Sequence, residues 1–189
     1  MATILIAFFG PALGATPSFM AESVSYRAGS SEDPHTTVKV FLGPQGKRLE
    51  GVPPRGLTVI SPRYTPRRFL LDAHRGLYAV DPSKGKGKKL GGLLAREPCR
   101  GFPQATQKGA RQYRGLAVEE WQCHHPAFGT TSQLYAPDLG VVVRDETEEG
   151  KVQELRSFQF RSPDPELFRF PEAEDWEEVP VMDLFQSRD

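Results

Sequence analysis

The sequence predicts a mainly β, antiparallel fold, and three observations support this class. The 18 glycines and 17 prolines are spread along the chain without a repeat, as expected for many short strands joined by turns. No stretch of the sequence sustains the apolar spacing of an amphipathic helix over three turns. The segment 134–161 has the pattern of three strands separated by turns rich in glycine and aspartate, Leu134–Ala136, Val141–Thr147 and Lys151–Arg161. We expect this meander to carry the main core.

Two details of the meander predict how its strands are packed. Val141, Val142 and Val143 cannot all face one side of a strand, so this strand is expected to be buried on both faces. In the last strand Phe158 and Phe160 share one face, while Leu155 falls out of phase with them. That break in alternation indicates a β-bulge.

The remaining elements follow from alternation and from turn residues. Strands are expected at Glu22–Ala28, Thr37–Leu42, Lys47–Val52, Leu57–Ser61, Phe69–Ala73, Leu77–Val80 and Leu116–Cys123, the last with Trp121 as its large apolar residue. Leu90–Arg96 is predicted to form a short helix, and a loop is expected from Pro98 to Gly109. Near the end, Pro165 is placed to begin one helical turn, capped by Asp164 or Ser162.

The N-terminus has the pattern of a secretory signal peptide. Residues 1–15 carry no charged side chain, and an apolar run is followed by small residues suited to cleavage. We therefore expect 1–15 to be removed and 16–189 to form a single exported domain. A buried N-terminal strand or helix is the alternative. The apolar run is too short to span a membrane, so a transmembrane protein is not expected.

Export determines how the two cysteines are interpreted. In an oxidising compartment Cys99 and Cys123 are expected to pair as a disulfide. A metal site with His124 and His125 is an alternative, but adjacent histidines on a strand point to opposite faces. Free thiols are the third possibility. No metal is expected.

Charge is unevenly distributed along the chain. Residues 55–114 contain 14 lysines and arginines against 3 acidic residues, whereas residues 115–189 contain 6 against 17. One interpretation is that these halves are neighbouring strands whose charges pair. The other is a basic rim that meets anionic headgroups, phosphates or an acidic partner.

No motif in the sequence indicates catalysis. The basic loop with Lys84, Lys86, Lys88 and Lys89 lacks the spacing of a phosphate-binding loop, and no G-x-S-x-G elbow is present. An enzyme and a cofactor are therefore not expected. Nucleic acid is not expected either, because no aromatic residues interleave the basic run.

A family pattern appears when these motifs are taken together. They are an early Ala-Glu strand, a Cys-led loop followed by the Trp121 strand, the strand Leu139–Arg144, and the closing segment Pro165–Pro171. This arrangement resembles exported bacterial proteins of unknown function related to the LolA/LolB-like lipoprotein-carrier superfamily. The resemblance implies a strongly curved, unclosed half-barrel with one or two short helices on its concave side. The helical segment that such carriers place before the first strand is missing here.

The function that the resemblance implies is a non-catalytic periplasmic carrier of a lipid, an acyl chain or a lipoprotein, bound in the concave face. The alternative is a structural or protein-interaction component of the cell envelope with no small-molecule ligand. Trp121, Leu155, Phe158 and Phe160 are expected in the core or along the concave face. For a bound lipid, Trp121, Phe158 and Phe160 would contact the tail, and Arg67 and Arg68 the headgroup.

Overall fold

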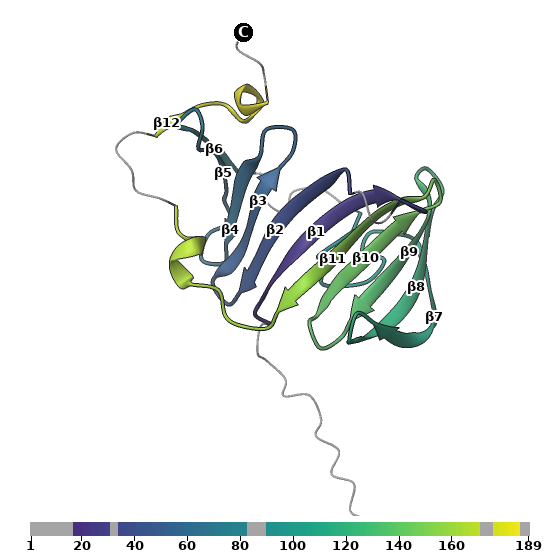
Figure 1. Ribbon diagram of the computed structural model, residues 1–189. Coiled ribbons are helices and arrows are strands. Elements are labelled where there is room, and N and C mark those ends of the chain that lie inside the picture. Colours follow the sequence, from purple (N-terminus) through teal and green to yellow (C-terminus); the bar gives the residue numbers. More distant parts are fainter. Residues whose placement is uncertain (1–16, 31–33, 83–89, 171–175, 186–189) are drawn as a thin grey trace, which may run out of the picture.

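The computed structural model describes residues 17–30, 34–82, 90–170 and 176–185. These residues form one sheet of twelve strands and two 3₁₀ turns (Figure 1). The strands are β1 Phe19–Arg27, β2 Thr36–Gly43, β3 Gly46–Val52, β4 Leu57–Pro62, β5 Arg68–Asp72, β6 Leu77–Asp81, β7 Gln104–Tyr113, β8 Leu116–His125, β9 Gly129–Ala136, β10 Val141–Thr147, β11 Lys151–Gln159 and β12 Glu177–Glu178. The turns are η1 Pro165–Phe168 and η2 Val181–Leu184. The mainly β class is confirmed.

The sheet contains two meanders, β1–β6 and β7–β11. Strand β1, the first of one meander, pairs with β11, the last of the other. The strand order of the sheet is β12-β6-β5-β4-β3-β2-β1-β11-β10-β9-β8-β7, so β12 and β7 are the edges and the sheet is not closed (Figure 1). All neighbours are antiparallel except β12 and β6, which are parallel. The open antiparallel sheet agrees with the sequence prediction.

The two packing details predicted for the meander are confirmed. Val141, Val142 and Val143 are each at most 2% exposed, as expected for a strand covered on both faces. Between β1 and β11 the register shifts at Ser157, which has a positive φ of 54°. This bulge lets Leu155 be fully buried while Phe158 packs against the same core.

The core has two main parts. The first joins β1 and β2 to β8–β11 through Phe19, Ala21, Val40, Leu42, Val118, Leu134, Ala136, Leu139, Val141, Val143 and Leu155. The second lies under β4, β5 and β6 and includes Val179 and Leu184 from the C-terminal segment. The C-terminal segment is thus part of the packed structure, with Glu177 and Val179 donating backbone hydrogen bonds to Gly76 and Tyr78.

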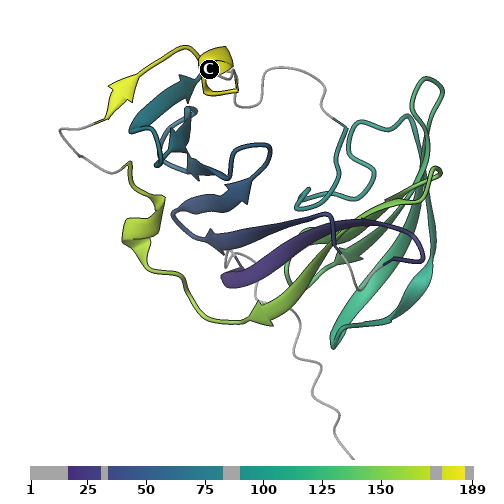
Figure 2. The same cartoon turned by 45° about the horizontal axis from the view of Figure 1, so that its top comes forward.

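The prediction of a helix at Leu90–Arg96 is wrong. Residues 90–103, here called the covering segment, form turns and lie against one face of the sheet (Figure 2). The backbone of Val142 in β10 is hydrogen-bonded to Leu94 and Ala95, and Gly91 bonds to Arg100. A Cβ at Gly91 would lie 2.7 Å from Cβ of Arg100, and Leu94 has a φ of 65°. Backbone N–H and C=O groups of the covering segment therefore find hydrogen-bond partners without forming a helix.

The loop expected from Pro98 to Gly109 is also wrong in part, because Gln104 to Gly109 belong to β7. The helical turn at Pro165 is confirmed as η1, and the carboxylate of Asp164 caps it by accepting from the N–H of Glu166 at 2.9 Å. The predicted signal peptide and the lysines of the basic loop lie outside the described residues. Within the described part of the chain, no helix is long and apolar enough to cross a membrane.

Candidate binding surface on strands β7 to β11

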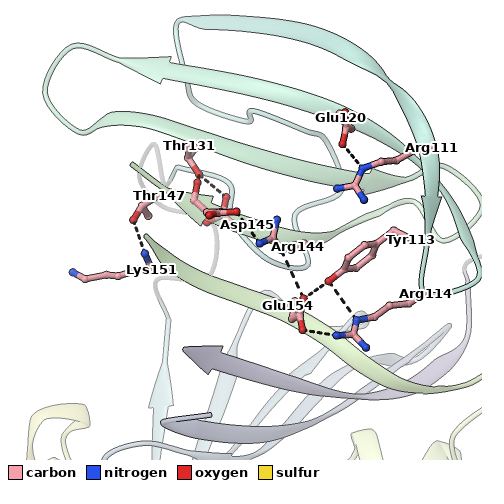
Figure 3. A network of polar contacts seen from close by, with 11 residues as sticks. Arg111, Tyr113, Arg114, Glu120, Thr131, Arg144, Asp145, Thr147, Lys151 and Glu154 are labelled. Carbon is pink, nitrogen blue, oxygen red and sulfur yellow. Dashed lines mark hydrogen bonds and ion pairs between the residues drawn. The ribbon is translucent and has the colours of Figure 1, made fainter. Parts of the chain in front are cut away.

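Glu154 of β11 is the centre of a polar network that crosses the sheet. It is 1% exposed and lies next to Tyr113, Arg114 and Arg144 (Figure 3). Arg156 of the same strand is a fourth neighbour. The hydroxyl of Tyr113 and Nε of Arg156 donate hydrogen bonds to the carboxylate of Glu154. Nη2 of Arg114 lies 2.9 Å from Oε1, and Nε of Arg144 lies 3.7 Å from Oε2.

Electrostatics keep this carboxylate charged in spite of its burial. Burial alone would raise the pKa of Glu154, but the hydrogen bonds from Tyr113 and Arg156 and the charges of Arg114 and Arg156 lower it. Burial and the hydrogen bond to Glu154 raise the pKa of Tyr113. The hydrogen bond with Tyr113 and the charge of Glu154 raise the pKa of Arg114, against the effect of burial. The network therefore consists of one buried anion held by three cations.

The contact between Tyr113 and Glu154 requires the sheet to bend. Tyr113 lies at the end of β7, and three strands separate β7 from β11. In a flat sheet these two strands would be about 19 Å apart, farther than the two side chains reach. Strands β7 to β11 therefore bend toward the face that carries Glu154.

A polar groove of about 330 Å³ lies on the same strands. Its lining includes Lys108, Arg111, Glu120, Arg144 and Glu146. Arg111 forms an ion pair with Glu120, and Nη2 of Arg144 lies 2.7 Å from Oε2 of Glu146. Arg111 and its neighbour Arg114 come from the basic half of the sequence, and their partners come from the acidic half. The prediction that these halves pair as neighbouring strands is confirmed for Arg111, whose partner Glu120 lies on the adjacent strand β8, whereas Arg114 reaches Glu154 across three strands.

The edge strand β7 is open to solvent along almost its full length. Nine of its ten residues are exposed, and only β8 pairs with it. A register shift between Gln107 and Gly109 marks a bulge at Lys108. The strand contains Lys108 and Arg111 and no acidic residue. Its unpaired backbone groups and positive charge make it the most accessible edge for an added strand.

The covering segment is fixed to the opposite side of this unit by covalent and polar contacts. Cys99 and Cys123 form a disulfide, as the sequence predicts. The amide of Gln133, which is 1% exposed, accepts from the N–H of Cys99 at 2.8 Å and donates to the carbonyl of Gly91 at 2.6 Å. It also donates to Asp145 at 2.9 Å. The segment is therefore a built-in part of the structure.

The aromatic residues predicted for a lipid tail are only partly brought together. The rings of Phe158 and Phe160 stack at 5.7 Å, and Phe158 contacts Phe19 at the same distance. Phe160 is 63% exposed and is not a core residue, because it follows the point where β11 ends. Trp121 lies on β8, which is separated from β11 by two strands. It lines the 330 Å³ groove and donates its indole N–H to Glu119 at 2.9 Å. Their role in binding remains a prediction.

The arginines predicted for a headgroup lie elsewhere in the sheet. Arg68 begins β5, which is separated from β11 by four strands. Its Nη1 lies 3.9 Å from Asp81, and its Nε is buried without a hydrogen-bond partner. Arg67 is exposed. The structure does not bring these arginines together with the phenylalanines, so a joint role in binding one lipid stays a prediction.

Cysteine and histidine side chains of these strands take part in structural contacts. Within the described residues, no group of three or more His, Cys, Asp or Glu side chains could hold a metal ion. The cysteines are joined to each other, and His125 packs against Phe128 at 4.7 Å between ring centroids. The features of this surface that could bind a partner are its charged side chains, the unpaired edge of β7 and the groove.

The central residues of this surface were missed by sequence reasoning. Glu154 shares a strand face with Val152, and a carboxylate at such a buried position is a signal for a paired charge. Tyr113 was not identified because β7 has no apolar alternation to mark it as a strand.

Neither a protein-family model nor a curated protein matches the sequence. Solved structures do match the fold. An uncharacterized conserved protein from Thermus thermophilus aligns with a TM-score of 0.57 and 11% identity, over 87% of this chain and 91% of that chain. PNGF-II aligns with a TM-score of 0.57 and 10% identity, over 89% of this chain but 32% of its own.

The third match is the MucA/MucB complex of Pseudomonas aeruginosa, with a TM-score of 0.53 and 11% identity. The match covers 87% of this chain and 58% of that chain. A LolA superfamily protein from Nitrosomonas europaea is also among the structural neighbours, with a TM-score of 0.37 and 9% identity. At these identities the likeness concerns the fold alone. The neighbours thus include a protein of the superfamily that the sequence resembles.

Proposed function

We propose that this protein is a non-catalytic, exported binding protein whose ligand is a segment of another protein. In this proposal residues 1–15 are removed as a signal peptide, and 16–189 form one half-barrel domain in the periplasm. The partner segment is extended and acidic, and it adds to the edge of β7 beside the polar groove.

The observation that carries the proposal is the contrast between the two sides of the β7–β11 unit. One side is occupied by the covering segment, held by the Cys99–Cys123 disulfide and by Gln133. The other presents an exposed ten-residue edge strand with Lys108 and Arg111. An added strand gains main-chain hydrogen bonds there, and acidic side chains gain the attraction of Lys108, while Arg111 is already paired with Glu120. MucB, a fold neighbour, is known in complex with MucA.

The proposal can be tested by position-specific photo-cross-linking in the native host. A photoreactive residue at Thr106 or Gln112, both exposed on β7, is expected to capture a protein. The same residue at Glu149, which is exposed in the turn after β10, is the control. Once the captured protein is identified, Lys108→Glu should weaken its binding, and Lys151→Glu, with the same charge change on β11, should not.

A lipid, acyl-chain or lipoprotein carrier is the second candidate. It is favoured by the exposed ring of Phe160, which stacks on Phe158 next to the core. Native mass spectrometry of the protein purified from its native host distinguishes the carrier from the proposed protein-binding function. A co-purified amphiphile together with saturable binding of a fluorescent fatty acid would favour the carrier. A co-purified protein whose binding depends on Lys108 would favour the proposed function.

A further inference from the structure

An aromatic groove on the other half of the sheet lies apart from the β7–β11 surface. Its volume is about 670 Å³, within the usual range of about 300–1,000 Å³ for ligand sites. Three aromatic residues line it: Tyr64 before β5, Phe170 after η1, and Trp176 before β12. The groove thus joins segments that are distant in the sequence.

One aromatic wall of this groove, Phe170, is held in place by neighbouring rings. The ring of Phe170 lies 5.2 Å from that of Phe69 and 4.7 Å from that of Tyr78. The wall of the groove formed by Tyr64 is open to solvent, because this residue is 71% exposed. An exposed aromatic residue beside a fixed one provides flat apolar surface for a ligand at a small cost in ordering.

The polar side chains around the groove are balanced in charge. Its lining includes the cations Arg48 and Arg169 and the anions Asp164 and Glu166. Nη1 of Arg48 donates to the carbonyl of Leu167 at 3.2 Å, and Nη1 of Arg169 lies 3.1 Å from Oε1 of Glu166. The lining thus holds two cations and two anions, and Arg48 is also paired with Glu50 beside the groove, so no unpaired cation remains among the described lining residues to attract an anionic ligand strongly. These side chains do supply many hydrogen-bond donors and acceptors at one site.

The backbone under the groove excludes an added strand. Thr58 of β4 and Leu71 of β5 contribute to the lining, and both strands are paired on each side within the sheet. Their main-chain groups are already hydrogen-bonded to neighbouring strands, so an extended peptide could contact only side chains there. This is the opposite of the edge at β7.

From these features we infer that the aromatic groove binds a short, uncharged oligosaccharide. The C–H faces of a sugar ring carry a small positive charge and pack on the negative faces of aromatic rings. The hydroxyl groups of the sugar both donate and accept, which matches a lining that contains both arginines and carboxylates. The groove volume accommodates a chain of a few rings.

Tryptophan fluorescence provides a direct test, because the chain has two tryptophans. In a Trp121→Phe background Trp176 is the sole reporter and lies in the groove. Titration with maltotetraose, cellotetraose and chitotetraose is expected to shift its emission saturably for at least one of them, with a Kd of about 1 mM or tighter. Tyr64→Ala should weaken that binding about tenfold.

The matched control is Phe128→Ala, which removes another exposed aromatic residue, 70% accessible and outside the groove. It should leave the titration unchanged. Absence of saturation with all three sugars, or equal binding by Tyr64→Ala, would overturn the inference. So would binding confined to an acidic peptide or to a charged saccharide such as a heparin tetrasaccharide.

Discussion

The hydroxyl of Tyr113 in β7 donates a hydrogen bond to the carboxylate of Glu154 in β11, although three strands lie between them in the sheet. Arg114, the next residue, also reaches Glu154. One edge of the sheet is therefore tied back to its middle through a single buried carboxylate. We expect these contacts to stabilise the bend of β7–β11 and, with it, the position of the exposed edge strand.

Glu154→Gln is expected to lower the free energy of unfolding by about 3–5 kcal/mol. The substitution keeps the shape of the side chain but leaves Arg114, Arg144 and Arg156 without their shared anion. Urea denaturation measures the change. Glu149→Gln, in an exposed turn, is the control and should change stability by less than about 0.5 kcal/mol. Equal effects of the two substitutions would contradict a central role for Glu154.

The same variant is expected to alter the dependence of stability on pH. The pKa of Glu154 is lowered in the folded state, so its contribution is fully present above the ordinary glutamate value of 4.5. The contribution is lost as the pH falls through the lower, folded value. Unfolding free energies measured from neutral pH down to acid should therefore decline less steeply in Glu154→Gln than in the natural protein. A parallel decline would show that other carboxylates dominate.

Asp145 is expected to behave in the opposite way. Burial raises its pKa, although hydrogen bonds from Gln133 and Thr131 lower it in part. A raised folded pKa means that its contribution is present below the ordinary value of 3.8 and is lost as the pH rises through the folded value. Asp145→Asn keeps an acceptor for both donors and should stabilise the protein at neutral pH by about 0.5–2 kcal/mol. Thermal unfolding at two pH values tests this, and destabilisation at neutral pH would refute it.

The fold class and the packing of the last meander could be predicted because local alternation and turn residues determine them. The bulge before Phe158 appears in the sequence as a broken alternation. Strand β7 could not be predicted, because an edge strand with two solvent-exposed faces needs no apolar residues. The covering segment was mistaken for a helix because its leucines have helical spacing. Its real conformation depends on a backbone bond within the segment, from Gly91 to Arg100, and on backbone bonds to the distant residue Val142.

The binding surface was less predictable than the fold for a related physical reason. Ion pairs such as Arg114 with Glu154 join residues 40 positions apart, and no local pattern encodes that register. The charge asymmetry between the two halves of the chain did indicate that such pairs form. It could not identify which carboxylate would be buried.

Replacing both Cys99 and Cys123 with alanine is expected to lower the free energy of unfolding by about 3 kcal/mol, because the bond closes a loop with a sequence separation of 24. Hydrogen exchange in residues 90–103 should increase, since the bond attaches this segment to β8. The natural protein treated with a reductant should match the double variant. Peptide mapping under non-reducing conditions that finds both thiols free would contradict the disulfide itself.

Phe158 and Phe160 form a matched pair for testing where the core ends on β11. Phe158 is half-buried and touches Phe19, so Phe158→Ala is expected to cost about 2–3 kcal/mol of unfolding free energy. Phe160 is 63% exposed and stacks only on Phe158 among its ring contacts within the described residues, so Phe160→Ala should cost less than about 1 kcal/mol. Urea denaturation of both variants provides the comparison. If Phe160→Ala is as costly as Phe158→Ala, the core extends past the end of β11 and the assignment is wrong. If it leaves stability unchanged but abolishes binding of a fluorescent fatty acid, Phe160 serves the carrier function.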